Sequence, residues 1–294
     1  MKQVASLFCL IVLCLLPGAV LRPASPPGAK TGYVAIGRYS LYYEETGKGD
    51  PLILIHGGLL DRRMWDGQFE LFGRWSRVIR YDNRNQGLSH GTPDSFAYPE
   101  DLNKLMEALG IARARLVGHS LGGKIAIDFA LAHPEKVSAL VLVSSGLSGY
   151  ENKDSAIVAN DKKEAEASAR RDMNGYIEYF QRSWTDGPRR TPDQVNRDVR
   201  QKVREMIRST LSRSEPYSTV LPLDPPAMGR LASIHVPTLF VLGELDNAGT
   251  QEIASLVLKG IPGSRKVVIK GAGHMVNMEK PEEFNEVVGE FLSR

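Results

Sequence analysis

Short apolar runs alternate with amphipathic segments along most of this chain. Six mainly apolar runs end in glycine or in polar residues, which is typical of strands buried on both faces of a sheet. The runs are PLILIHGG (51–58), RVIRYD (77–82), ARLVGHS (114–120), VSALVLVSS (137–145), PTLFVLGELD (237–246) and RKVVIKGAGH (265–274). Before them, residues 33–47 alternate around Gly37 and Arg38, a pattern that predicts a β-hairpin.

The segments between these runs have helical spacing. In residues 101–111, Leu102, Leu105, Met106 and Leu109 share one face. Further helices are predicted at LGGKIAIDFALAH (121–133) and at PEEFNEVVGEFLS (281–293). Strands that alternate with helices predict an α/β fold, a mostly parallel twisted sheet with helices on both faces. The carboxyl ends of its strands then meet along one edge, where such folds bind ligands.

The alternation is interrupted once, between residues 147 and 230. This stretch is polar and highly charged, and its spacing is helical. Within it, residues 195–211 carry an apolar stripe opposite a face rich in arginine and lysine. The stripe is formed by Val195, Val199, Val203, Met206 or Ile207, and Leu211. A basic amphipathic helix can lie on a membrane, but a helix with one solvated face is the commoner case. We interpret the insertion as a helical lid over the functional edge of the sheet.

The first residues read as a targeting segment. A short basic start is followed by VASLFCLIVLCLLPGAV (4–20), which is typical of an export signal. An uncleaved N-terminal anchor is the alternative, although a membrane span needs about 20 apolar residues. The predicted division is an export signal (1–19), a Pro-rich tether (20–32), the core of the α/β fold (33–146 and 231–294) and the lid (147–230). We therefore expect a periplasmic or secreted protein.

The net charge and the positions of the cysteines indicate which partners and cofactors can be expected. The chain has 294 residues and a net charge of +3, with both signs spread along the sequence, so no basic face for nucleic acid is indicated. Its only cysteines, Cys9 and Cys14, lie in the N-terminal segment. The rest of the chain therefore offers neither a disulfide framework nor a thiolate metal site. We expect a small-molecule substrate, no metal and no organic cofactor; the oligomeric state cannot be predicted.

One serine stands where a predicted strand meets a predicted helix. Gly118-His119-Ser120-Leu121-Gly122 fits the pattern G-x-S-x-G in the strand-to-helix context that this motif requires. The turn must be so tight that residues two positions away on either side cannot carry a Cβ atom. It presents the hydroxyl at the start of a helix, whose positive end favours developing negative charge. Ser120 is therefore the candidate nucleophile.

A serine hydroxyl is a weak nucleophile unless a base takes its proton, and that base needs an orienting acid. Asp246 ends a predicted strand, and His274 follows the last strand in a loop with two glycines. Three residues at three strand ends, in the order Ser, Asp, His, predict a catalytic triad. Glu244 is a weaker candidate for the acid, because it points to the other side of an extended strand end.

An oxyanion hole needs backbone N–H groups that point at one site. We predict that the amides of Gly58, after the strand 51–55, and of Leu121, after the nucleophile, form this pair.

These motifs resemble the α/β-hydrolase superfamily, in its lid-bearing form. The resemblance runs from about residue 33 to 292 and rests on HGG (56–58), GHSLGG (118–123), GELD (243–246), GAGH (271–274) and YDNRNQGLSHG (81–91). The last segment looks like the D-x-R-G-x-G-x-S segment of the family, but Asn85 stands where glycine is usual. Asn tolerates a left-handed conformation, so we expect the loop to keep its form. Asp82, Arg84, Gly87 and Ser89 are interpreted as structural.

The resemblance also narrows the reaction. Relatives that open epoxides or remove halide carry Asp at the nucleophile position, and dienelactone hydrolases carry Cys, so Ser120 disfavours these activities. The stretch LLDRRMWDGQFELF (59–72) resembles enol-lactonases and small carboxylesterases. Met64 and Trp65 are candidates for the acyl pocket, although packing of the first helix explains them better. His119 and Met275, the neighbours of the nucleophile and the base, are further pocket candidates.

The sequence therefore predicts a serine hydrolase that cleaves a small carboxylic ester or lactone. An amidase of the proline-iminopeptidase kind or a carbon–carbon bond hydrolase would use the same triad and stays open as an alternative. A binding protein that keeps the fold without turnover is the alternative from another class.

Overall fold

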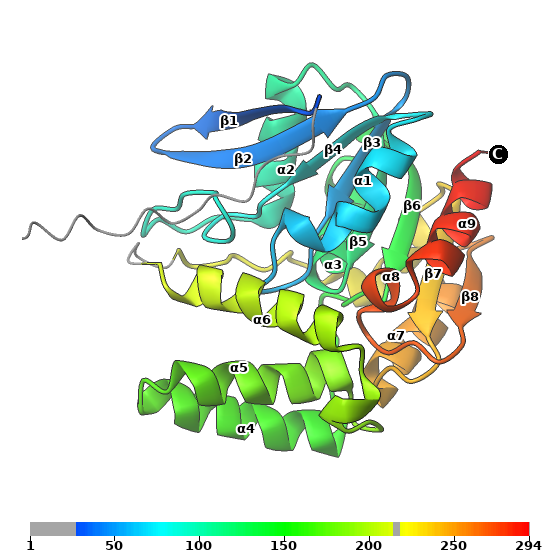
Figure 1. Cartoon of the computed structure of the whole chain (residues 1–294). Coiled ribbons are helices and arrows are strands. Elements are labelled where there is room, and N and C mark those ends of the chain that lie inside the picture. The colour runs from blue at the N-terminus through cyan, green and yellow to red at the C-terminus, as the bar shows by residue number, and fades with distance from the viewer. Residues whose placement is uncertain (1–27, 214–217, 294) are drawn as a thin grey trace, which may run out of the picture.

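A single sheet organises the chain. The computed structural model describes residues 28–213 and 218–293. In this part, eight strands pair in the order β1-β2-β4-β3-β5-β6-β7-β8 (Figure 1). Their bounds are β1 Lys30–Ile36, β2 Tyr39–Thr46, β3 Pro51–Ile55, β4 Arg77–Tyr81, β5 Ala114–His119, β6 Val137–Val143, β7 Thr238–Gly243 and β8 Arg265–Ile269. The predicted export signal and most of the tether lie outside the described residues.

The pairing of the strands follows from their connections. β1 and β2 form the predicted hairpin, and β2 also pairs antiparallel with β4. From β4 to β8 all neighbours are parallel, because helices connect them on both faces. The carboxyl ends of β5, β7 and β8 consequently lie at one edge. The α/β fold predicted from the alternation of strands and helices is confirmed.

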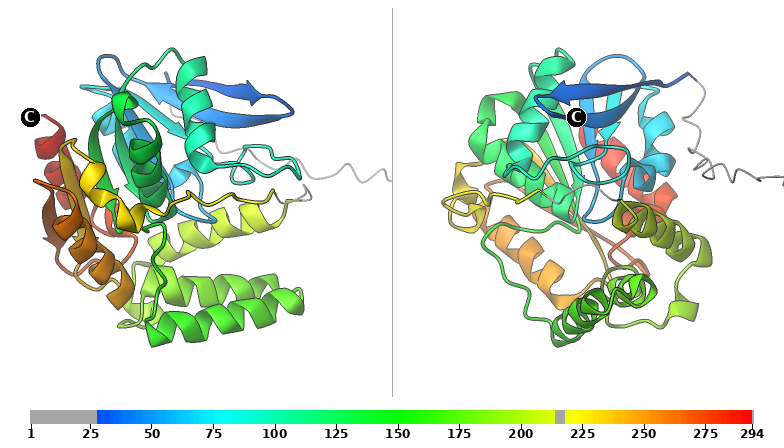
Figure 2. Two further views of the ribbon diagram at one scale, coloured as in Figure 1. Left: turned by 180° about the vertical axis from the view of Figure 1, so that it is seen from behind. Right: turned by 90° about the vertical axis from the view of Figure 1, so that its left-hand side faces the viewer.

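Two apolar layers cover the sheet, one on each face. Helices cover both faces of the sheet (Figure 2). Along β3, Ile53 and Ile55 point into the layer under α2, α3 and α7, whereas Leu52 and Leu54 point into the layer under α1 and α9. The helices are α1 Asp66–Phe72, α2 Tyr98–Ala108, α3 Leu121–Ala132, α7 Ala248–Gly260, α8 Val276–Glu279 and α9 Pro281–Leu292. α2 starts three residues earlier than its predicted segment, because Pro99 suits the first turn of a helix. β8 is less buried than its apolar pattern suggests, because it is an edge strand.

The insertion between β6 and β7 is helical. It contains α4 Ser155–Ala169, α5 Met173–Gln181, a π-helical turn at Arg182–Asp186 and α6 Arg197–Leu211. In Figure 1, α4 and α5 lie side by side, and α6 lies between them and the sheet. This placement puts the insertion next to the carboxyl ends of the strands.

The predicted stripe of α6 is its buried face. Val199, Val203 and Ile207 of this stripe pack into the layer under α1. On the other faces, Arg200 pairs with Asp186, and other basic side chains pair with carboxylates of α5 and α1. The charges of Arg200, Lys202 and Arg204 are therefore neutralised within the protein. No helix of the described part is long and apolar enough to cross a membrane.

Candidate active site

Ser120 stands at a strained turn between β5 and α3. Its backbone has φ 51° and ψ −111°, a conformation that side chains with a Cβ atom rarely adopt. A Cβ atom on Gly118 would lie 2.2 Å from the carbonyl oxygen of Gly122, and one on Gly122 would lie 2.1 Å from that of Ile55. The two glycines are therefore required by backbone packing. This agrees with the tight turn deduced from the motif.

Neighbouring strands hold this turn in place. The amide of Ser120 donates a hydrogen bond of 2.9 Å to the carbonyl of Val143, at the end of β6. The carbonyl of Ser120 accepts hydrogen bonds from the amides of Lys124, at 3.0 Å, and Gly146, at 2.9 Å. These contacts tie the strained residue to β6 and to the first turn of α3, so the position of the hydroxyl is set by the sheet.

The structure brings Asp246 and His274 together. Both carboxylate oxygens of Asp246 lie 3.0 Å from Nδ1 of His274, and both side chains are buried. Asp246 also accepts hydrogen bonds from the backbone and side-chain nitrogens of Asn247. With its proton on Nδ1, the imidazole can take a proton at Nε2. Glu244 is exposed and instead accepts a hydrogen bond from the amide of Gly271.

A pocket of about 220 Å³ joins these groups. Its lining consists of Gly57, Gly58, Leu60, His119, Ser120, Leu121, Phe180, Trp184, His274 and Met275. Both predicted oxyanion residues are among them, and they are neighbours in space. A Cβ atom on Gly58 would lie 3.8 Å from Cδ2 of Leu121. The pocket therefore places a nucleophile, a base and two candidate amides around one volume.

A buried histidine supports the loop that carries Gly58. His56 Nε2 accepts a hydrogen bond of 2.9 Å from the amide of Asn83, and its Nδ1 lies 2.8 Å from the carbonyl oxygen of Gly57. Burial lowers the pKa of His56, mainly through loss of water around the ring. The neutral ring with its proton on Nδ1 satisfies both contacts. His56 thereby links the loop after β3 to the loop after β4.

His119 supports the loop that carries the base. Its ring lies edge-on to the ring of His274, with centroids 4.9 Å apart, and its Nε2 lies 2.9 Å from the carbonyl oxygen of His274. Burial, together with the nearby imidazole of His274, lowers the pKa of His119 to about 3. The ring is therefore neutral near pH 7, and Nε2–H donates to that carbonyl.

The four predicted pocket residues divide into two pairs. His119 and Met275 line the pocket, whereas Met64 and Trp65 do not. Met64 lies behind the loop that carries Gly57 and Gly58, where its sulfur accepts a hydrogen bond of 3.4 Å from the amide of Gly57. Trp65 is fully buried in the core, with its ring 6.2 Å from that of Phe284. The prediction that Met64 and Trp65 line the acyl pocket is therefore wrong, and both side chains instead pack the start of α1 against the sheet.

Two aromatic residues of the pocket escaped the sequence analysis. Phe180 lies in α5 and Trp184 in the π-helical turn that follows it. The ring of Trp184 lies 5.0 Å from that of His274. The aromatic cluster in YIEYFQRSW (176–184), inside an otherwise polar insertion, was the available signal. Nothing local indicated which of its rings turns toward the sheet.

The loop after β4 keeps its form despite Asn85. This residue adopts φ 63°, the left-handed conformation expected where relatives carry glycine. Asp82 accepts hydrogen bonds from the amides of Arg62 and Leu88, and Ser89 Oγ donates to the carbonyl of Asp82. Arg84 forms a buried ion pair with Asp101 of α2. These residues are structural, as predicted.

Comparison with known proteins identifies the family. The profile of the alpha/beta hydrolase fold matches residues 50–281. The chain belongs to the α/β-hydrolase family.

Within its described residues, no group of three or more histidine, cysteine, aspartate or glutamate side chains is arranged to hold a metal ion.

Several α/β-hydrolase relatives are similar over most of their length. A putative 2-succinyl-6-hydroxy-2,4-cyclohexadiene-1-carboxylate synthase of Bacillus subtilis is 28% identical, over 87% of this chain and 95% of its own. Carboxylesterase YbfK of the same species is 27% identical, over 82% and 79%. A 2-hydroxy-6-oxo-6-phenylhexa-2,4-dienoate hydrolase of Comamonas testosteroni is 26% identical, over 90% and 95%.

Among solved structures, the enol-lactonase of Burkholderia xenovorans LB400 matches with a TM-score of 0.72. It is 24% identical and covers 90% of this chain and 100% of its own, a likeness that concerns the fold. The α/β hydrolases similar to this chain thus differ in the bond they act on.

Proposed function

We propose that this α/β hydrolase cleaves a carboxylic ester or lactone of a small molecule through an acyl-enzyme on Ser120. The observation that carries the proposal is the shared pocket. Ser120, held at positive φ, lines the same small volume as His274, whose Nδ1 is held by Asp246. A base held in one tautomer beside a presented serine hydroxyl is the arrangement that acyl transfer requires.

The reaction proceeds in two halves. As Ser120 Oγ bonds to the carbonyl carbon, its proton moves to Nε2 of His274, and the electron pair of the C=O bond moves to oxygen. The amides of Gly58 and Leu121 hold this oxyanion. The intermediate then expels the alkoxide, which takes the proton from His274. In the second half, His274 takes a proton from water as the water oxygen bonds to the acyl carbon. The resulting oxyanion intermediate breaks its bond to Ser120 Oγ, which takes the proton back from His274, and the carboxylic acid is released.

The pocket lining favours an uncharged, compact acyl group. Apart from the two histidines, its side chains are apolar or aliphatic hydroxyl, and none is Lys, Arg, Asp or Glu. A volume of about 220 Å³ is below the roughly 300–1,000 Å³ of sites for drug-sized ligands. A charged group would enter without a counter-ion, which is costly among apolar side chains.

The same argument weighs against the enzymatic alternatives. The name of the Comamonas relative specifies a dienoate, a substrate with a carboxylate, and no cationic side chain lines this pocket to receive one. An iminopeptidase needs acidic side chains for the substrate amino group, and the lining offers none. A neutral ester or lactone meets neither difficulty.

The test is hydrolysis of p-nitrophenyl acetate, butyrate and decanoate by the full chain. We expect the rate to fall from acetate and butyrate to decanoate, and Ser120→Ala to lower turnover about 1,000-fold or more. Ser168→Ala, at an exposed serine of α4, is the matched control. A fluorophosphonate should label the parent protein and the control, but not Ser120→Ala. If Ser120→Ala keeps its turnover, the mechanism is wrong. A folded protein without turnover or labelling would favour the non-catalytic binding role.

We further propose that the protein is exported. The basic start and apolar segment at residues 1–20 support this, and the uncleaved anchor is the alternative. N-terminal sequencing of protein recovered from cell fractions separates the cases. Export with cleavage predicts a new N-terminus near residue 20 outside the cytoplasm, whereas an anchor predicts the intact N-terminus in the membrane fraction. Intact protein in the cytoplasm would contradict both.

A further inference from the structure

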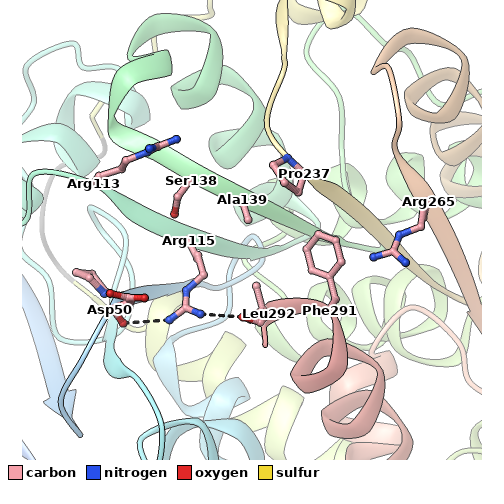
Figure 3. A pocket seen from close by; sticks show the side chains of 10 residues that line it. Asp50, Arg113, Arg115, Ser138, Ala139, Pro237, Arg265, Phe291 and Leu292 are labelled. Atoms are coloured by element: carbon pink, nitrogen blue, oxygen red, sulfur yellow. Dashed lines mark hydrogen bonds between the residues drawn. The ribbon is translucent and has the colours of Figure 1, made fainter. Parts of the chain in front are cut away.

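A second hollow lies at the edge of the sheet opposite to Ser120. It measures about 580 Å³, against about 220 Å³ for the pocket at Ser120. It is lined where β5, β6, β7 and β8 begin and where α9 ends (Figure 3). Arg113 and Arg115 flank the first residue of β5, and Arg265 is the first residue of β8. The parallel strands thus bring arginines that are distant in sequence to one surface depression.

The three guanidinium groups have no ion-pair partner among the described residues. Arg115 donates to the carbonyls of Leu292 and Asp50 and to Ser76 Oγ, and Arg113 donates to the carbonyl of Val137. All these acceptors are neutral. The one carboxylate in the lining, that of Asp50, forms no ion pair with any of the arginines, so the hollow holds excess positive charge.

Five arginines elsewhere in the described part of the chain, buried or half-buried, differ from Arg115 in this respect. Each of them pairs with a carboxylate: Arg62, Arg80, Arg84, Arg190 and Arg200. Burial lowers the pKa of Arg115, an effect that Asp50 only partly opposes, because water has been removed from the cation without a paired anion. The Nε atom of Arg115 is buried and has no acceptor. Arg115, half-buried at the hollow, therefore lacks the paired carboxylate that these five arginines have.

The remaining wall is apolar. Phe291 of α9 and Pro237 before β7 contribute to it, and the guanidinium of Arg265 lies 5.3 Å from the ring centroid of Phe291. In Figure 3, Phe291 stands between Leu292 and Arg265 on the lining, so a cationic group adjoins the apolar wall. Such a surface suits a ligand with an anionic head and an apolar body.

We propose that this hollow binds a small organic oxoanion, a carboxylate or a phosphate ester, through Arg113, Arg115 and Arg265, with its apolar part on Phe291. Guanidinium groups bind carboxylate and phosphate oxygens in pairs and keep their charge at all relevant pH values. The site is separate from the pocket at Ser120 and does not depend on the function proposed for it.

The test is calorimetric titration of the full-length protein with phenyl phosphate, benzoate and inorganic phosphate at low and high ionic strength. We expect phenyl phosphate to bind more tightly than inorganic phosphate, because only the ester covers the apolar wall. Comparison of benzoate with phenyl phosphate tells which headgroup is preferred. The double variant Arg113→Gln/Arg265→Gln should weaken binding about tenfold or more. Both side chains are exposed, so the fold should persist; Arg115 is left intact because it holds the end of α9.

Arg170→Gln, at an exposed arginine that ends α4, is the control for loss of one positive charge. It should bind like the parent protein. Equal affinity of the double variant and the parent protein would overturn the proposal, as would the absence of binding by all three probes at about 10 mM. Thermal unfolding of each variant establishes that the comparison is between folded proteins. Should the double variant melt early, the two single variants provide the same comparison.

Discussion

The indole ring of Trp184 lies against the imidazole of His274, with ring centroids 5.0 Å apart and planes inclined at 49°. Trp184 belongs to the insertion, whereas His274 follows the last strand of the sheet. The π-helical turn that carries Trp184 is held by a buried ion pair between Asp186 and Arg200 of α6. The insertion thus supplies a wall of the candidate active site, and an ion pair within the insertion holds this wall to α6.

Replacement of Trp184 should change the size of the pocket. We expect Trp184→Ala to lower kcat/KM for p-nitrophenyl acetate about tenfold, because the aromatic contact with His274 is lost and water enters. The enlarged pocket should shift the preference toward longer acyl chains. Trp184→Phe, which keeps an aromatic ring, should retain most of the activity. Initial rates across the acetate, butyrate and decanoate series check this. An unchanged chain-length preference in Trp184→Ala would show that the ring does not bound the acyl site.

Replacement by alanine should affect the stability of the fold differently at two glycines of the site. Gly122→Ala places a Cβ atom 2.1 Å from the carbonyl oxygen of Ile55, so it should destabilise the fold by about 3 kcal/mol or more. Gly58→Ala meets no atom closer than 3.8 Å and should change stability by less than about 1 kcal/mol. Urea unfolding of the two variants measures both values. Similar losses for both would contradict the packing of the turn described above.

Two buried histidines should make the protein less stable in acid. Burial lowers the pKa of His56, and it lowers that of His119 to about 3, from an unfolded value near 6.5. The unfolded chain therefore binds more protons between these values, and the free energy of unfolding falls as pH falls from about 6.5 toward 3. His119→Gln should flatten this slope, whereas His235→Gln, at an exposed position, should not. Urea unfolding at pH 7, 5.5 and 4.5 tests the expectation; equal slopes for the two variants would refute it.

A buried carboxyl group of α4 should have the opposite effect. Burial, and then the neighbouring Asp161, raises the pKa of Glu164 to about 7. The folded protein keeps the proton that the unfolded chain loses above about 4.5, so this group reduces stability as pH rises from 4.5 to 7. Glu164→Gln should therefore raise the melting temperature at pH 8 and leave it nearly unchanged at pH 4.5. Glu166→Gln, at an exposed site of the same helix, should leave the melting temperature nearly unchanged at both pH values. A gain that is equal at both pH values would exclude titration of Glu164 as its cause.

The strands and their mostly parallel arrangement could be predicted from sequence because their signals are local, whereas the order of the strands in the sheet was not predicted. Continuous apolar runs mark strands buried on both faces, and the connecting helices make the strands parallel. Parallel strands align their carboxyl ends, which is why Asp246 and His274, at the ends of two such runs, could be expected at one edge near Ser120. The glycines around Ser120 were also informative by themselves, since a Cβ atom has no room in so tight a turn. The catalytic roles of these residues stay predictions.

Other features depended on contacts between segments that are far apart in the chain. The sequence left Met64 and Trp65 open between the acyl pocket and the packing of the first helix, which it favoured, and only the docking of α1 against the sheet places both in the interior. Trp184 is one of several aromatic residues in a polar insertion, and only the packing of that insertion against the sheet brings its ring into contact with His274. Arg113 and Arg265 are far apart in sequence, and the parallel strands alone brought them to one hollow. The local sequence pattern determines which helix or strand forms and which residues form a tight turn. The neighbours of each side chain depend on how the elements pack, because that packing is the sum of many contacts between residues distant in sequence.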